Sequence, residues 1–307
     1  MKQRTRYGLW PLIAGFSVLL SGCTLEVLNP GAILDEDLNT PDLMPIVVAG
    51  SSAELNDVMD GYAFTGGLLT EDLSGTGSYF STGQYRLGRF DNQNSEGFWE
   101  QTHEAAWAAG EAWARLQTVL ESAASTNADA ARLFYLMGTA HQRLGENFCD
   151  LVYDKGPVQP RTAAFDSAII AFNQSKAIGG AANAAKYVTA GWGGLAQAYV
   201  GLGDWGSAVA AAGNVATDYV IEAIYHQAAN SNQVYNETWG RAEVGVWATP
   251  IARQYNKASE VVNYKSTGDP RVPYTVCGSW NDTNRPPDVT LGVTPTGTCT
   301  GQGSGAT

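Results

Sequence analysis

Apolar residues recur at helical spacing between Lys186 and Tyr219. The first half of this stretch has apolar residues at i, i+3, i+4 and i+7, namely Trp192, Leu195, Ala196 and Tyr199, which places them on one face of an α-helix. Gly201 and Gly203 interrupt the pattern, because glycine readily takes the left-handed conformation that ends a helix. Asp204 is a suitable N-cap for a second helix, which carries the small or apolar residues Ala208, Ala212 and Val215. The pattern predicts two antiparallel helices that approach closely.

Other segments show the same spacing. We expect helices at 42–60, 98–122 and 127–150, the last capped by Asn127 or Asp129. The insertion FCDLVYDKGPVQPRT follows, and after it a helix that contains Ala168 and Phe172. One or two further helices are expected within 220–243.

The order of residues in the hairpin resembles a tetratricopeptide (TPR) repeat, a helix-turn-helix unit of roughly 34 residues. The segment from 127 to the helix around Phe172 would be a second such unit, with the insertion between its two helices. An ordinary alanine-rich helical hairpin is the alternative. The predicted fold class is all-α in the main, with TPR-like helical hairpins, long irregular loops and little sheet.

Two segments carry aromatic residues without helical spacing. The first, 62–98, is rich in Gly, Ser and Thr and should be irregular with one short helix; the second begins at Gly245. Aromatic rings on loops can stack on the apolar faces of sugar rings, while polar neighbours bond to the hydroxyl groups. The candidate ligand-binding residues are Tyr79, Phe80, Tyr85, Arg86, Trp280 and Asn281. The alternative, that these rings anchor long loops to the helices, stays open.

The first residues form a targeting signal. A basic start precedes an apolar run from Gly8 to Leu20, too short to span a bilayer stably, so we predict a secretory signal peptide over 1–22. Its end, Leu20-Ser21-Gly22-Cys23, resembles the lipobox of bacterial lipoproteins, in which the cysteine thiol is acylated and the chain is cut just before it. Cys23 is therefore the expected lipid attachment site and membrane anchor. The alternative is an ordinary signal peptide with a chance cysteine.

Net charge and the absence of catalytic motifs reduce the number of function classes that the sequence allows. The chain of 307 residues has a net charge of −12, and Arg and Lys form no cluster outside its first six residues, so we expect no nucleic-acid partner. It contains no HExxH, CxxC, Walker A or Gly-x-Ser-x-Gly motif. His103 has no histidine one turn away. We expect no enzyme activity, no cofactor and no metal, although paired carboxylates could still meet in three dimensions.

The cysteines beyond Cys23 have two expected roles. Cys277 and Cys299 enclose a polar loop and are a possible disulfide in an oxidising compartment. Cys149 is expected to be a half-buried packing residue.

Three stretches carry a family resemblance. "LEVLNPG", followed by "LNTPDLMPIVVAG" just after the lipobox, is similar to the start of SusD/RagB-like outer-membrane lipoproteins. The insertion, with its Gly-Glu…Asp…Pro loop, and the Gly-Asp-Pro-Arg turn at 268–271 resemble that family too. The resemblance implies a helical, TPR-based protein on the cell surface. It would capture an oligosaccharide or peptide nutrient for a TonB-dependent receptor. A TPR-type lipoprotein scaffold that binds another envelope protein is the rival.

The residue patterns and the resemblance together give a domain organisation. Family members usually continue well beyond this length, so we expect a fragment or a short variant. The expected parts are the signal peptide 1–22, an N-terminal strap and first helix 23–61, a TPR-like body 62–244 and a loop-rich C-terminal segment 245–307.

Overall fold

The computed structural model describes residues 33–75, 80–90, 92–226, 231–240 and 244–245, without the side chains of 86, 92–96 and 239–240. Residues up to Leu38 and residues from Asn39 onward form two separate compact units. The described part of the first unit contains the single-turn 3-10 helix η1 (Asp35–Leu38). Everything below belongs to the second unit.

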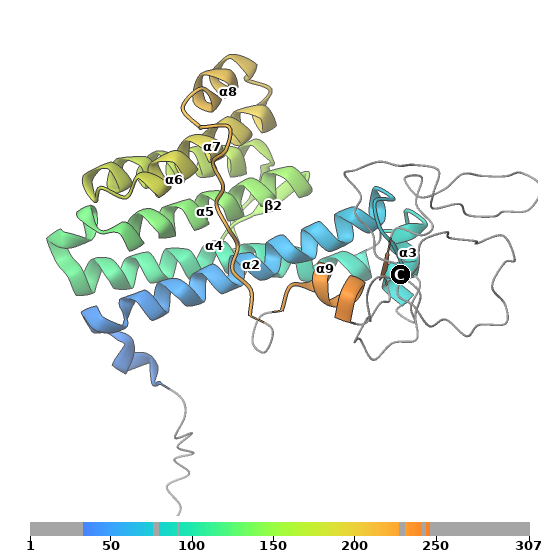
Figure 1. The fold of residues 1–307 in the computed structure, drawn as a ribbon, viewed down its shortest axis with the longest axis horizontal. Coiled ribbons are helices and arrows are strands. Elements are labelled where there is room, and N and C mark those ends of the chain that lie inside the picture. Colours follow the sequence, from blue (N-terminus) through green and yellow to red (C-terminus); the bar gives the residue numbers. More distant parts are fainter. Residues whose placement is uncertain (1–32, 76–79, 91, 227–230, 241–243, 246–307) are drawn as a thin grey trace, which may run out of the picture. The chain divides into compact units, whose positions relative to one another are not determined.

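The described chain is mainly helical, which confirms the predicted fold class (Figure 1). Its α-helices are α2 (Met44–Leu69), α3 (Phe80–Arg86), α4 (Asn92–Leu120), α5 (Ala128–Asn147), α6 (Thr162–Ala181), α7 (Ala185–Leu202), α8 (Trp205–Ala212) and α9 (Gln233–Tyr235). The 3-10 helices η2 (Pro41–Leu43) and η3 (Glu121–Thr126) and the π-helix η4 (Asn236–Gly240) complete the helical elements.

Within the described residues, two small antiparallel sheets accompany the helices. Strand β1 (Ser74–Gly75) pairs with β4 (Val244–Gly245), and β2 (Asp150–Val152) pairs with β3 (Val158–Pro160). The second pair is the insertion predicted between α5 and α6, folded as a hairpin. Leu151 of this hairpin is fully buried against Leu144 of α5 and Ala164 of α6. The insertion is therefore an integral part of the helical body.

Successive long helices pack side by side, so that α4 lies between α2 and α5, and α6 lies between α5 and α7 (Figure 1). Alanines at helical spacing make this possible on α4, where Ala105, Ala109 and Ala112 are buried. A small side chain lets the neighbouring backbone approach closely. The core runs along this row of helices.

Glycine and phenylalanine lock α6 between its two neighbours. The Phe172 ring lies so close to Gly138 of α5 and Gly194 of α7 that neither position has room for a side chain. A Cβ at Gly138 would be 2.7 Å from the ring, and a Cβ at Gly194 would be 2.4 Å from it. One heptad earlier, Phe165 lies in the same way against Gly145 and Gly201, and both rings are fully buried. Each ring thus fills a hole that exists only because glycine stands on both sides.

Several local predictions agree with the structure. The Asn127 side chain accepts a hydrogen bond from the Asp129 N–H at 2.7 Å, and the Asp204 side chain accepts one from the Ser207 N–H at 3.0 Å. Gly203 has a φ of +76° and ends α7 as expected. Gly201 was expected to help end this helix, but it lies inside α7 and its role is to make room for Phe165.

Other boundaries differ from those predicted. Helix α2 runs on to Leu69 instead of ending near residue 60, and the irregular segment 62–98 is correspondingly shorter. Helix α8 ends at Ala212, before Val215. The chain from 220 to 225 is not helical. It crosses from α7, where the Tyr219 hydroxyl donates to the Lys186 carbonyl at 2.7 Å, to α2, where the Tyr225 hydroxyl donates to the Asn56 carbonyl at 2.9 Å.

Candidate functional site

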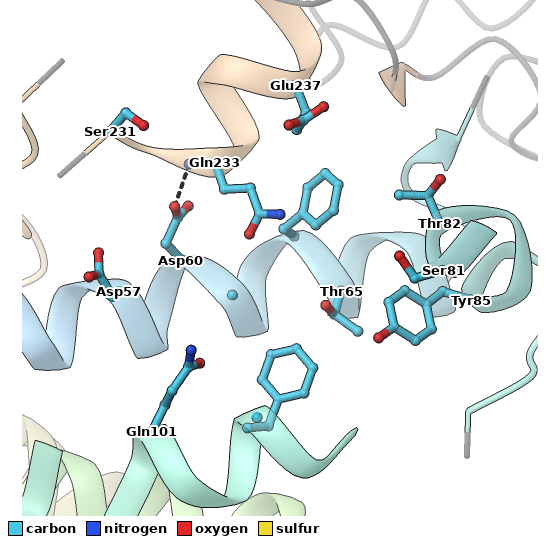
Figure 2. A pocket seen from close by; sticks show the side chains of 14 residues that line it. Asp57, Asp60, Thr65, Ser81, Thr82, Tyr85, Gln101, Ser231, Gln233 and Glu237 are labelled. Carbon is cyan, nitrogen blue, oxygen red and sulfur yellow. Dashed lines mark hydrogen bonds between the residues drawn. The ribbon is translucent and has the colours of Figure 1, made fainter. Parts of the chain in front are cut away.

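A cavity of about 540 Å³ opens between α2, α3, α4 and the segment that contains α9 and η4. Figure 2 shows side chains from these four parts of the chain converging on it. Helix α2 contributes Asp57, Asp60 and Phe64, and α3 contributes Ser81, Thr82 and Tyr85. Helix α4 adds Phe98 and Gln101, and the last segment adds Ser231, Gln233 and Glu237. The size is typical of a small-molecule site.

Asp60 fastens the last of these segments to α2. Its carboxylate is buried, with 5% of the residue exposed. The carboxylate accepts hydrogen bonds from the Asn232 amide Nδ2 at 2.9 Å and from the Gln233 backbone N–H, which is the dashed line in Figure 2. The Val234 N–H donates to it at 3.5 Å. One carboxylate thereby holds the start of α9 in place and forms one wall of the cavity.

The cavity is acidic. Asp57, Asp60 and Glu237 line it, and none of its described lining residues is Lys or Arg. Burial raises the pKa of Asp60, although the backbone N–H donors of Gln233 and Val234 act in the opposite direction. Burial also raises the pKa of Asp57. These carboxylates can accept hydrogen bonds from hydroxyl or N–H groups and would repel an anionic ligand.

Aromatic rings supply the apolar part of the lining. Tyr85 is 7% exposed and Phe64 is 4% exposed, and both belong to a small core cluster with Leu68 and Val244. The Phe98 ring of α4 packs on α2, where a Cβ at Gly61 would lie 3.1 Å from it. The cavity therefore combines flat apolar surfaces with fixed hydrogen-bond acceptors.

The structure brings one of the predicted ligand-binding residues into this cavity. Tyr85 lines it. Phe80, at the start of α3, is 76% exposed and is not among the lining residues. Arg86 lies in α3, but its side chain is not described. The remaining predicted residues, Cys23, Tyr79, Trp280, Asn281, Cys277 and Cys299, lie outside the described residues.

Sequence analysis missed the acidic half of the cavity. Asp60 and Gln233 are 173 residues apart in the chain, so no local motif could join them. The only signal was the presence of Asp57 and Asp60 within a stretch otherwise patterned as an apolar helix face.

A second polar cluster lies at the β2–β3 hairpin. The Tyr153 ring is 5.5 Å from the His103 ring and 5.7 Å from the His141 ring, centroid to centroid. The Tyr153 hydroxyl lies 3.4 Å from His141 Nδ1. His103 has no histidine one turn away on its own helix, but His141 of the next helix, α5, lies near it. No group of three or more metal-ligating side chains occurs among the described residues.

Cys149, expected to be half-buried, is instead exposed as a free thiol beside the start of β2. The hairpin turns its neighbour Leu151 into the core, and Cys149 stays at the surface.

Comparison with known proteins leaves the class open. No protein-family model matches the chain, and no curated protein matches it. Within the described ranges, none of the helices combines the length and the hydropathy needed to cross a membrane. The fold and the cavity define a mainly helical protein with an acidic, aromatic-lined pocket.

Proposed function

We propose that the protein is a SusD/RagB-like outer-membrane lipoprotein that binds an oligosaccharide nutrient in the acidic cavity and passes it to a TonB-dependent receptor. The cavity is the observation that carries the proposal. A sugar offers an apolar C–H face to a ring such as Phe98 and hydroxyl donors to acceptors such as Asp57 and Gln101. The absence of Lys and Arg from its described lining disfavours phosphorylated or carboxylated ligands.

A glycan array followed by calorimetric titration of the purified mature protein tests the ligand class. The proposal expects saturable binding of neutral oligosaccharides. Asp57→Asn should weaken it about tenfold, because a hydrogen bond to a charged group is worth roughly 1.5–3 kcal/mol. Glu111→Gln removes an exposed carboxylate on α4 that is not among the lining residues, and this control should leave the affinity unchanged. Equal effects of the two variants would contradict the proposal.

The lipid anchor is tested separately by metabolic labelling with palmitate. The proposal expects label on the wild-type protein and none on Cys23→Ala. A labelled Cys23→Ala protein would overturn the assignment of the anchor.

A separate observation, the exposed apolar surface of α8, favours the rival function of a scaffold for another envelope protein. Helix α8 ends the row of TPR-like helices, and two large apolar residues one turn apart on it are exposed, Trp205 by 66% and Val209 by 74%. Exposed apolar patches of this kind mark protein interfaces in many proteins. Capture of a partner other than the receptor, lost in Trp205→Ser and kept in Asp57→Asn, would favour the scaffold.

A further inference from the structure

A second cavity, of about 400 Å³, lies between α2 and the end of α5. Met59 and Tyr62 of α2 line it, whereas Asp57 and Asp60 of the same helix line the acidic cavity. The helical repeat places these two pairs on nearly opposite faces of α2. The Phe98 ring of α4 stacks on Tyr62 and separates the two cavities. The second cavity is therefore a site of its own.

Aromatic rings form its apolar walls, and packing outside the cavity holds them in place. Tyr62 stacks on Phe98 with 5.2 Å between ring centroids and an interplanar angle of 22°. The Tyr62 hydroxyl shares a hydrogen bond of 2.9 Å with the Thr102 hydroxyl. Phe148, which also lines the cavity, packs edge-on against Trp99 at 5.0 Å. Flat apolar surface is thus in position before any ligand arrives.

The charged residues of its described lining are Arg143 and Glu146, which pair with each other on α5. The Arg143 Nε–H also donates to the sulfur of Met59 at 3.2 Å. Gln142, which is 1% exposed, donates its Nε2 to Glu146 Oε1 at 2.7 Å and to Gln197 Oε1 at 2.6 Å. Both charges are therefore fixed at the wall. The guanidinium carries more N–H groups than these bonds use.

This ion pair selects the charge of a ligand. An anion would be attracted by Arg143 and repelled by Glu146, and a cation would meet the reverse. A ligand that carries both a carboxylate and an ammonium group satisfies both residues. Helix α5 has no basic residue in its last turn, so the negative end of its dipole favours an ammonium group near Glu146.

The direct contact between Arg143 and Glu146 also limits the distance between the two ligand charges. They must lie close together, as they do on the α-carbon of a free amino acid. The ammonium and carboxylate groups at the two ends of a peptide are separated by the chain. The aromatic walls then favour a flat, apolar side chain.

We propose that the second cavity is a separate site for a free α-amino acid with an aromatic side chain. The ligand carboxylate would accept hydrogen bonds from the Arg143 guanidinium, and its ammonium group would donate to Glu146. Its ring would pack against Tyr62, Phe98 and Phe148. This inference goes beyond the proposed function and holds whether or not the acidic cavity binds a sugar.

Calorimetric titration of the purified mature protein with L-phenylalanine tests the ligand class. We expect saturable binding of L-phenylalanine. Three comparison compounds each lack one recognised group: 3-phenylpropionate lacks the ammonium, 2-phenylethylamine lacks the carboxylate and L-alanine lacks the ring. Each should bind about tenfold more weakly or worse, because a hydrogen bond to a charged group, or the apolar contact of a ring, is lost.

Variants test the location. Arg143→Gln and Glu146→Gln should each weaken binding of L-phenylalanine about tenfold. The matched controls are Arg132→Gln on the same helix and Glu111→Gln on α4, both outside the lining, and they should leave the affinity unchanged. Asp57→Asn, in the acidic cavity, should leave it unchanged too.

The possible results separate this site from the proposed function. If L-phenylalanine does not bind, the amino-acid site is overturned, while sugar binding in the acidic cavity is unaffected. Equal binding of L-phenylalanine and the two singly charged compounds contradicts recognition of both charges. Binding that Asp57→Asn weakens, or that neither Arg143→Gln nor Glu146→Gln weakens, places the ligand elsewhere and overturns the inference. Glu146 is exposed, so its variant decides if Arg143→Gln disturbs the fold.

Discussion

Phe172 occupies a hole that glycine leaves open on both sides, and the neighbouring residues of α7 allow a strict test of this packing. A Cβ at Gly194 would lie 2.4 Å from the Phe172 ring, whereas a Cβ at Gly193 would meet only a Val215 methyl group at 4.0 Å. Gly194→Ala should lower the free energy of unfolding by about 1–3 kcal/mol through overpacking. Gly193→Ala should raise it by up to about 1 kcal/mol through helix propensity. Urea unfolding of both variants checks this, and equal shifts would contradict the packing.

His141 gives the molecule a pH dependence whose sign follows from its surroundings. Burial, and the nearby His103 imidazole, lower the pKa of His141 from 6.5 to about 4. Below pH 6.5 the unfolded chain takes up a proton that the folded protein does not, so stability falls as the pH falls from 6.5 towards 4. The slope is at most about 1.4 kcal/mol per pH unit.

The comparison of wild type with His141→Phe isolates this effect, because the carboxylates titrate in both proteins. The gap in unfolding free energy between neutral pH and about pH 5 should be smaller in His141→Phe. An identical gap in the two proteins would show that His141 is protonated in the folded state.

At the scale of elements, the β2–β3 hairpin is a structural part of the body and can be tested as such. Leu151 is fully buried, whereas its neighbour Val152 is 36% exposed. Leu151→Ala should cost about 2–5 kcal/mol of unfolding free energy, as a cavity forms under the hairpin. Val152→Ala should cost well under 1 kcal/mol. Thermal unfolding of the pair is the measurement, and a Leu151→Ala protein as stable as wild type would show that the hairpin is an appended loop.

Asp60 should govern the attachment of the segment 231–240 to α2. In Asp60→Asn an amide replaces the carboxylate that accepts from the Asn232 side chain and from the Gln233 and Val234 N–H groups. We expect faster hydrogen exchange at residues 232–237, because their anchor is weakened. Asp57→Asn, one turn earlier on the same helix, should leave this exchange unchanged. Unaltered exchange in Asp60→Asn would show that the segment is held by other contacts.

The sequence predicted those elements whose signals are local. Helical spacing and caps such as Asn127 and Asp204 lie within a few residues, and the structure contains them. Helix α2 was predicted too short because the segment from residue 62 onward is rich in Gly, Ser and Thr. Its Gly66 and Gly67 are instead helical, and a Cβ at Gly67 would lie 2.9 Å from Leu73. Tertiary packing overrode the local preference there.

At the scale of the whole molecule, the sequence predicted only part of the candidate site. Tyr85 was recognised because an aromatic residue in polar sequence stands out. Asp60 and Glu237 were missed because their neighbours in the cavity come from elements far apart in the chain. A single sequence does not reveal which residues far apart in the chain come into contact. The acidic character of the cavity is therefore visible only in the folded structure.

The crossing chain between α8 and α9 makes this cavity possible. It spans from α7 to α2 and is held at Tyr219 and Tyr225, which brings α9 and η4 beside α2 (Figure 1). The packed row of helices fixes the separation of α2 and α4. The segment that contains α9 and η4 then closes the side of the cavity that these helices leave open. The cavity therefore depends on the integrity of the whole helical body.

The most direct test of the account is a crystal structure of the mature protein with the oligosaccharide that binds most tightly on the array. The account predicts electron density for sugar units in the cavity between Asp57 and Tyr85, with a C–H face against Phe98. Sugar bound only elsewhere, with this cavity filled by solvent, would contradict it.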